Sequence, residues 1–394
     1  MAKDFIVAIE LGSSKITGIA GKKNPDGSIT VLSVAKEDSK ACMRKGVVYN
    51  IDKTAQALTN IINKLKGSLQ TDIARVYVGV GGQSLKGVKN VVVKDLPADS
   101  IVTQDIVNEL MDTNRNMKNN DYEVLDAITQ EYKVDMLDEL NPVGVQACHI
   151  EGNFLNLLWR KTFNRSLNKC FDNAGIPIVE MYVTPLAMAE EILTEAEKCA
   201  GCMLVDLGAD TTTVAIYTRD ILRHLFVLPL GSNNITKDLT TLKMEEREAE
   251  AMKLKYASAY TEVADIDDSM VWAIDSNRSV NSRLFIDVVE ARVLEIIANV
   301  WYLVPTEYTD KLLGGIILTG GGSNLKNIDE AFRDQSYDPD NTYSVPYTKV
   351  PAAQHSPRNG KDKHPPRRND ERSDKHSAQR RHELCRKRPE QNTL

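Results

Sequence analysis

Hydrophobic and polar residues alternate from residue 5 to about Phe332 in blocks that predict strands and helices in turn. Residues 5–9 (Phe-Ile-Val-Ala-Ile) form an apolar run that predicts a first strand. Segments 236–260 and 283–303 repeat apolar residues every three or four positions, which predicts amphipathic helices. Their predicted buried faces hold Leu239, Leu242, Ala249, Met252, Tyr256 and Ala259 in the first, and Leu284, Val288, Val289, Val293, Ile296, Ile297 and Val300 in the second. This mixture over 394 residues predicts an α/β protein of two domains or lobes.

The pattern stops after Phe332, and from Val350 onwards the chain has few residues that a core could bury. Residues 350–394 carry twelve Lys or Arg against six Asp or Glu. Such a segment cannot offset its own ordering entropy, which predicts a basic, disordered tail over 336–394. The abrupt change also fits a shifted reading frame, a hypothesis that translation of the coding DNA in all three frames would test.

Composition narrows the possible functions. The formal net charge is −6 although the tail is basic, so the body is acidic and nucleic acid is not expected as a partner. No apolar run reaches the roughly 18 residues of a membrane helix, and no secretory signal is recognised at the start. Six scattered cysteines fit a reducing cytoplasm. Cys199 and Cys202 form a single Cys-x-x-Cys pair, which favours buried thiols over a metal or redox site.

Two segments about 200 residues apart repeat one pattern. Each is an apolar strand that ends in a carboxylate, Glu10 or Asp206, followed by Leu-Gly, small polar residues and a second strand. Gly12 and Gly208 let the main chain approach a ligand closely. Successive backbone N–H groups in such a turn form an anion-binding concavity. Two such turns in register predict duplicated lobes that hold phosphates from both sides of a cleft.

The side chains of the turns refine this prediction. Hydroxyl donors and one cation come from Ser13, Ser14, Lys15, Thr211 and Thr212. The carboxylates Glu10, Asp206 and Asp210 would repel a bare phosphate. Their presence therefore predicts Mg²⁺, or its bound waters, between the protein and the phosphates.

A third element is the apolar strand 314–319, which runs into Gly320-Gly321-Gly322. A helical pattern follows, with Ser323 or Asn324 as its predicted N-cap. The loop has the spacing of neither a P-loop nor G-x-G-x-x-G. Because it follows the two hairpins, it is predicted to form the wall that holds the purine and ribose.

These three glycine-rich elements, in this order and spacing, resemble those of the actin/Hsp70/sugar-kinase superfamily. Within it, residues 4–333 resemble the FtsA family of bacterial division proteins. Further family-like stretches are 76–82 (Val-Tyr-Val-Gly-Val-Gly-Gly), 141–144, 175–185, 193–198, 228–231, 235–239, 249–253 and 289–292. The resemblance implies an actin-like two-lobed α/β fold, with duplicated ribonuclease-H-like domains around a nucleotide cleft and a small inserted α+β subdomain.

The resemblance also implies domain boundaries and site residues. The first lobe would span 1–75 and 149–198, the inserted subdomain 76–148, and the second lobe 199–335 with a helical subdomain at about 236–303. ATP would be held by Gly12, Ser13, Ser14 and Lys15 in a phosphate-1 loop, by Asp206, Gly208, Ala209, Asp210, Thr211 and Thr212 in a phosphate-2 loop with Gly231, and by Gly320, Gly321, Gly322 and Ser323 in an adenosine loop. Glu10 and Asp206 would hold Mg²⁺ through water. Glu250 and Lys253 would face adenine and ribose, although their spacing alone favours an exposed ion pair.

In function, the resemblance implies a cytoplasmic adaptor that polymerises head to tail and links the FtsZ ring to the cytoplasmic face of the inner membrane. Its partners would be FtsZ, further copies of itself and other division proteins, and it would be at most a slow ATPase. Two departures from the family are Glu10, where actin relatives usually have Asp, and Ala257, where Gly is common. No amphipathic membrane helix is recognised after Phe332.

Two alternatives stay open at this point. A small-molecule kinase of the same superfamily would use a general base beside the phosphates, with Asp210 or Glu10 as candidates. A pilus-assembly or chaperone-like relative would bind a peptide or an inner-membrane partner instead of FtsZ.

Overall fold

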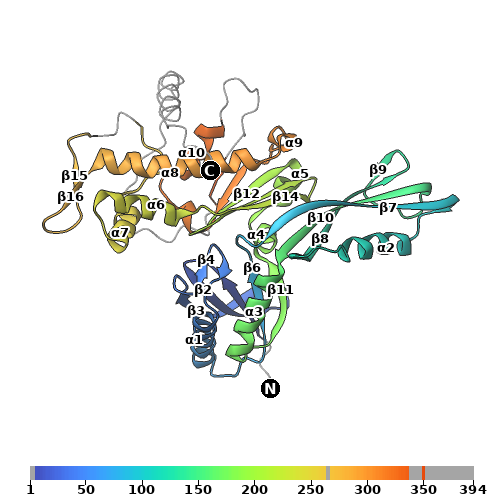
Figure 1. Ribbon diagram of the computed structural model, residues 1–394, viewed down its shortest axis with the longest axis horizontal. Coiled ribbons are helices and arrows are strands. Elements are labelled where there is room, and N and C mark those ends of the chain that lie inside the picture. Colours follow the sequence, from blue (N-terminus) through green and yellow to red (C-terminus); the bar gives the residue numbers. More distant parts are fainter. Residues whose placement is uncertain (1–4, 263–266, 337–347, 351–394) are drawn as a thin grey trace.

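The computed structural model describes residues 5–262, 267–336 and 348–350. They form two lobes, each built on a five-stranded sheet, and a third unit built on a four-stranded sheet (Figure 1). In the view of Figure 1 the first lobe lies at the bottom, the second lobe runs across the top, and the third unit projects to the right. The predicted α/β fold of two lobes with an inserted α+β subdomain is confirmed. Most of the predicted tail over 336–394 lies outside the described residues.

The first lobe is a sheet in the order β11-β6-β1-β2-β3, covered on one face by two helices. Its elements are β1 (Ile6–Leu11), β2 (Lys15–Lys23), β3 (Ile29–Asp38), β4 (Met43–Arg44), β5 (Val47–Val48), α1 (Ile51–Leu69), β6 (Val76–Val80), α3 (Lys161–Ala174) and β11 (Ile178–Val183). Asn50 caps α1, because its side chain accepts a hydrogen bond from the backbone N–H of Lys53. The apolar stripe of α1, including Leu58, Ile61 and Leu65, is fully buried. This core holds the first hairpin in place.

The second lobe repeats the strand order as β14-β13-β12-β17-β18. Its strands are β12 (Cys202–Leu207), β13 (Thr212–Thr218), β14 (Ile221–Leu228), β17 (Ile316–Thr319) and β18 (Thr348–Lys349). The two hairpins also agree in register: Leu11 pairs with Ile16 in the first, and Leu207 pairs with Thr212 in the second. The repeat seen in the sequence is therefore a repeat of structure.

Strand β18 corrects the predicted tail at one place. Thr348 is buried, and β18 pairs in parallel with β17, so the predicted disorder from residue 336 does not hold at 348–349. Lys349 also forms an ion pair with Glu197 of α5 (Glu195–Ala200). This short strand completes the edge of the second sheet.

The helices of the second lobe partly follow the predictions. They are α4 (Thr184–Ile192), α5, α6 (Ser232–Leu239), the 3₁₀ turn η1 (Thr240–Leu242), α7 (Glu246–Tyr256), α8 (Ser282–Leu303), α9 (Thr306–Thr309), the 3₁₀ turn η3 (Gly321–Asn324) and α10 (Ile328–Ser336), with a small hairpin of β15 (Val271–Ala273) and β16 (Ser279–Asn281). Helix α8 confirms the second predicted helix. Leu284, however, is 50% exposed because it lies on the side of α8 away from the buried Phe285 and Val289.

The predicted helix over 236–260 was wrong as a single helix, since it is divided into α6, η1 and α7. The hydroxyls of Thr240 and Thr241 donate hydrogen bonds to the carbonyls of Lys237 and Asp238, both at 2.6 Å, and end α6. Lys243 then adopts a left-handed backbone conformation with φ of 61°. In α7, Ala249 and Met252 are buried as predicted, and Lys253 is buried beside them.

The inserted subdomain is a sheet in the order β7-β10-β8-β9, with one face covered by a helix. Its elements are β7 (Lys86–Ile101), α2 (Gln104–Arg115), β8 (Tyr122–Val134), β9 (Leu137–Glu139) and β10 (Gln146–Arg160). Strand β6 belongs to the first-lobe sheet, where it pairs with β1, so the predicted start at residue 76 was too early. Strand β10 runs past the predicted end at 148. We propose 86–160 as the extent of this subdomain.

The end of the inserted subdomain nearest the lobes packs against β14 of the second lobe. The Gln130 side chain donates a hydrogen bond to the carbonyl of Leu222 at 2.9 Å, and Arg223 lies 3.2 Å from the carboxylate of Glu131. Arg223 is buried. The covalent connections of this subdomain run to β6 and α3 of the first lobe. Its contacts through Gln130 and Glu131 join it to the second lobe.

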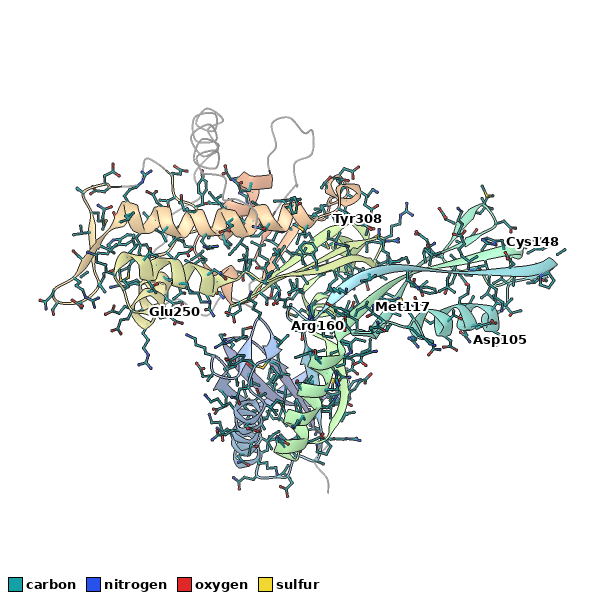
Figure 2. All side chains as sticks on the ribbon, in the orientation of Figure 1. Asp105, Met117, Cys148, Arg160, Glu250 and Tyr308 are labelled. Atoms are coloured by element: carbon teal, nitrogen blue, oxygen red, sulfur yellow. The ribbon has the colours of Figure 1, made fainter. Side chains whose placement is uncertain are left out.

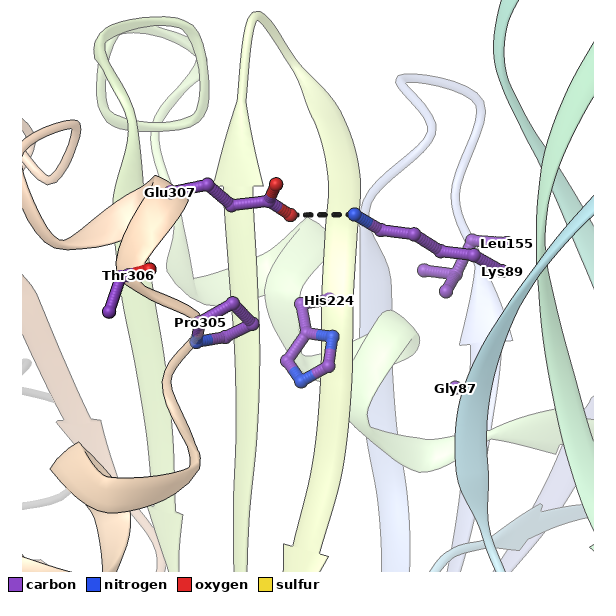
Figure 3. A pocket seen from close by; sticks show the side chains of 7 residues that line it. All are labelled: Gly87, Lys89, Leu155, His224, Pro305, Thr306 and Glu307. Atoms are coloured by element: carbon purple, nitrogen blue, oxygen red, sulfur yellow. Dashed lines mark hydrogen bonds and ion pairs between the residues drawn. The ribbon is translucent and has the colours of Figure 1, made fainter.

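A small cavity of about 360 Å³ lies at this junction (Figure 3). It is lined by Gly87, Lys89, Leu155, His224, Pro305, Thr306 and Glu307. Lys89 Nζ lies 2.6 Å from Glu307 Oε1, but both side chains are about half exposed, so this ion pair adds little stability. Burial and the nearby Lys89 lower the pKa of His224, which keeps its ring neutral at pH 7. Stability at the junction comes mainly from an apolar cluster in which Leu155 and Leu157 of the inserted subdomain pack against Leu225 of β14, and the Arg223 and Gln130 contacts add to it.

Candidate functional site

A cavity of about 960 Å³ lies between the two lobes, within the size range of ligand sites. The predicted site residues that line it are Glu10, Gly12, Ser13, Ser14 and Lys15 from the first lobe, and Asp206, Gly208, Ala209, Thr211, Glu250, Lys253, Gly320, Gly321, Gly322 and Ser323 from the second. Figure 2 shows Glu250 on the side of the second lobe that faces the first lobe, whereas Asp105 and Cys148 lie far out on the inserted subdomain. The fold thus brings three separate glycine-rich segments to one cleft.

The two hairpin turns have the same geometry. The backbone N–H of Gly12 donates to the carbonyl of Lys15 at 3.1 Å, and that of Gly208 donates to the carbonyl of Thr211 at 2.9 Å. A Cβ atom at Gly12 or Gly208 would lie 2.7 Å from the same carbonyl oxygen. Both turns therefore require glycine because the backbone closes on itself.

The third loop is as tight. Gly320 has φ of 85°, and a Cβ atom there would lie 2.2 Å from Asp206 Oδ1. The Ser323 hydroxyl donates to the carbonyl of Gly320 at 2.8 Å. The predicted N-cap was wrong, since Ser323 lies within the turn η3 and helix α10 begins only at Ile328. The loop therefore presents backbone groups to the cleft where a helix end was expected.

The carboxylates of Glu10 and Asp206 face the same cavity from opposite lobes. Burial, followed by the charge of Asp206, raises the pKa of Glu10 to about 7, although its side chain still meets the water of the cleft. Burial raises the pKa of Asp206 to about 6. Oxygen donors of this kind fit Mg²⁺, which usually binds one or two carboxylates and keeps several waters. Among the described residues, no three His, Cys, Asp or Glu side chains gather into a denser metal site.

These raised pKa values predict that Mg²⁺ binding releases protons. Near pH 6.5 part of the Glu10 and Asp206 population is protonated, and a cation must displace those protons. Without metal, folding stability falls as pH rises from about 4 to about 7, because the folded chain holds protons that the unfolded chain releases. Calorimetric titration of Mg²⁺ with ADP in two buffers of different ionisation heat would measure the release, after subtraction of the protons that ADP alone releases on binding Mg²⁺. We expect it at pH 6.5 and not at pH 8.5. Equal heats in both buffers at pH 6.5 would contradict it, and Glu10→Gln should reduce it.

The pair Glu250 and Lys253 is not the exposed ion pair that spacing alone favours. Lys253 is 7% exposed, and its Nζ lies 2.7 Å from Glu250 Oε2, 2.8 Å from Thr236 Oγ1 and 3.2 Å from the carbonyl of Ser232. Burial alone would raise the pKa of Glu250, but hydrogen bonds from Lys253 and Thr236 outweigh it, and the pKa is lowered. The lowered pKa keeps Glu250 ionised at pH 7, and both residues line the cleft.

Three predicted site residues do not line the cavity. Thr212 is buried in the sheet, where its hydroxyl donates to the carbonyl of Leu230 at 2.9 Å. Gly231 supports the phosphate-2 loop, since a Cβ atom there would lie 2.5 Å from the carbonyl oxygen of Ala209. The carboxylate of Asp210 accepts hydrogen bonds from the backbone N–H of Lys45 at 3.2 Å and from the amide of Asn233 at 2.8 Å. Asp210 is therefore poorly placed to act as a general base in the cavity.

Several lining residues were not predicted from the sequence. They include Gly46, Thr184, Met188, Asn233, Asn327 and Val350. Gly46 has φ of 72°, and a Cβ atom there would lie 2.4 Å from the Cα of Gly82. The Lys45-Gly46 pair is a recognisable turn signal, but nothing in the sequence places it beside the cleft.

Comparisons with known proteins agree on one family. A family model described as "Cell division protein FtsA" matches residues 203–369, and one described as "SHS2 domain inserted in FTSA" matches residues 82–158. A cell division protein FtsA of Porphyromonas gingivalis is 32% identical over 332 residues, which cover 82% of this chain and 69% of that relative.

Solved structures agree on the fold. A PilM-PilN type IV pilus biogenesis complex matches with a TM-score of 0.56 and 14% identity, covering 84% of this chain and 85% of that chain. MreB5 of Spiroplasma citri bound to ADP matches with a TM-score of 0.51 and 12% identity, covering 88% and 91%. At 14% identity, the first match shows only that this chain and a pilus protein share a fold. The chain belongs to the FtsA family of cell division proteins and has the actin-like fold.

Proposed function

We propose that this chain binds ATP with Mg²⁺ in the interlobe cleft and acts as an actin-like adaptor that links FtsZ to the membrane during cell division. The observation that supports it most is the pair of hairpin turns, alike in register and hydrogen bonding, that line one cavity together with the Gly320–Ser323 loop. MreB5, which shares the fold, was solved with ADP.

The residues of the cleft suit the parts of a nucleotide. The N–H groups of the two turns, with the hydroxyls of Ser13 and Ser14, would hold the phosphates, and Lys15 would offset their charge. Glu10 and Asp206 would hold Mg²⁺, which neutralises phosphate charge when bound. Gly320 to Ser323, with Glu250 and Lys253, would hold the adenosine. Hydrolysis is proposed to be slow at most, because Asp210 is engaged by Lys45 and Asn233.

The proposed partners are FtsZ, further copies of the chain in a head-to-tail polymer, and other division proteins, with no role for nucleic acid. The proposed location is the cytoplasm, at the cytoplasmic face of the inner membrane where a membrane-targeting tail is present. In the part of the chain that the structure describes, no helix has the length and apolarity to span a bilayer. Nothing in the described residues favours the kinase or pilus-assembly alternatives.

Co-sedimentation with FtsZ filaments, with and without ATP and Mg²⁺, tests this function. We expect the purified chain to pellet with FtsZ and not alone at low concentration. A chain that binds a fluorescent ATP analogue but stays in the supernatant with FtsZ would contradict the adaptor role. Phosphorylation of a sugar or polyol in the same preparation would instead support a kinase.

A further inference from the structure

The turn Lys45-Gly46, between β4 and β5, contacts both phosphate loops. Its two consecutive backbone N–H groups donate in different directions: Gly46 to the hydroxyl of Ser13 in the first lobe at 2.8 Å, and Lys45 to the carboxylate of Asp210 in the second lobe at 3.2 Å. The carbonyl of Lys45 accepts from the N–H of Gln83 at 2.9 Å. The turn is therefore fixed to its own lobe and reaches across the cleft by one bond.

The geometry of the turn leaves it little freedom. Lys45 and Gly46 both have left-handed backbone conformations, with φ of 49° and 72°. Gly46 packs directly on Gly82, where a Cβ atom on either residue would lie 2.4–2.5 Å from the other's Cα. Such a turn keeps its N–H groups aimed in fixed directions, which favours a defined bond over a mobile contact.

On the other side of the cleft, hydrogen bonds also fix the side chain of Asp210. Its second carboxylate oxygen accepts from the Asn233 side chain at 2.8 Å, and the backbone N–H of Asn233 donates to the carbonyl of Ala209 at 2.7 Å. Another polar contact between the lobes, Lys40 with Glu246 at 3.8 Å, joins two largely exposed side chains and is weak. The Asp210–Lys45 bond, a directed hydrogen bond from a backbone N–H that the turn holds in place, is the shorter of these two links.

We infer that Asp210 is a positioning residue that clasps the two lobes through the Lys45 N–H and sets how fast the cleft opens for nucleotide exchange. This inference rests on the proposed nucleotide binding. The cleft cannot open widely without breaking this bond, whether nucleotide is bound or absent. The clasp therefore slows entry and exit alike and changes affinity little. A residue that contacted the phosphates directly would mainly slow exit.

Asp210→Ala tests the clasp, with Asp210→Asn as a graded variant because an amide offers one acceptor in place of two. Glu246→Gln is the control, since it neutralises an exposed carboxylate that also reaches across the cleft. Two quantities are measured: amide hydrogen exchange of the segment containing residues 45–46 in the nucleotide-free protein, and stopped-flow association and dissociation of a fluorescent ADP analogue.

For Asp210→Ala we expect about threefold to tenfold faster exchange at 45–46, and similar increases in both rate constants, as loss of one hydrogen bond of ordinary net strength implies. Asp210→Asn should be intermediate and Glu246→Gln unchanged. Unchanged exchange, or a rise in dissociation alone, would overturn the clasp. If the wild-type chain binds no fluorescent ADP, the proposed function fails, while the exchange measurement still decides whether Asp210 joins the lobes.

Discussion

Replacement of Gly320 by valine is expected to abolish nucleotide binding at micromolar concentrations and to destabilise the fold by about 3 kcal/mol. The backbone of Gly320 has φ of 85°, a region that β-branched residues avoid. The added Cβ atom would also lie 2.2 Å from Asp206 Oδ1 and 2.6 Å from the carbonyl oxygen of Leu207. One substitution therefore distorts the loop that is proposed to hold adenosine and displaces a carboxylate that is proposed to hold Mg²⁺.

A titration with a fluorescent ATP analogue should show an affinity loss of at least about a hundredfold, equivalent to about 2.8 kcal/mol. Urea unfolding gives the stability change separately. Gly321→Ala is a comparison variant in the same loop, since no atom lies within 4 Å of its added Cβ and its backbone has ordinary φ, so it should lose far less affinity than Gly320→Val. The proposed cleft fails if Gly320→Val binds nucleotide like the wild type.

Lys253→Met is expected to lower the free energy of unfolding by about 2 kcal/mol and to weaken nucleotide binding. The Lys253 ammonium is the shared donor to Glu250, to the hydroxyl of Thr236 and to the carbonyl of Ser232. Its removal leaves Glu250 without its cation. The loss is smaller than for a fully buried pair because Glu250 is 34% exposed and can take up water.

The matched control is Lys255→Met, two residues along α7, where the side chain is exposed. Urea unfolding of both variants at pH 7 should separate them by more than about 1 kcal/mol. A second check is pH: loss of the Lys253 partner should let the pKa of Glu250 rise, so the stability of Lys253→Met should fall less than that of the wild type on acidification. Equal unfolding energies for the two variants would show that the Lys253 contacts contribute nothing.

Features set by local sequence were predictable. The hairpin turns depend on Gly12 and Gly208 closing on carbonyls three residues away, and that pattern is visible in the sequence. Helix α8 was predictable because its apolar period runs unbroken for 22 residues. The break between α6 and α7 was not, since it depends on two threonine hydroxyls and on the left-handed Lys243, none of which changes the apolar period.

Features set by contacts between distant segments were missed. Strand β6 reads as part of the inserted subdomain until its parallel pairing with β1 is known. The burial of Lys253 depends on Thr236 and Ser232, which reach it only after the chain turns at Lys243. Likewise, Asp210 looks like a phosphate-side carboxylate in the sequence, while its partner Lys45 stands 165 residues earlier in the chain. No local pattern encodes such a pair.

The attachment of the inserted subdomain has a mechanical consequence. The chain enters the subdomain from β6 of the first lobe and returns from it to α3 of the same lobe. The end of the subdomain nearest the lobes, however, is bonded to β14 of the second lobe through Arg223 and Gln130. A rotation of one lobe against the other must therefore either carry the subdomain with the second lobe or break those bonds. If it is carried, the subdomain works as a lever arm: its outer end, at Cys148 in Figure 2, sweeps further than any part of the cleft that drives it. A small change in the angle between the lobes would then produce its largest displacement at the outer end of the subdomain.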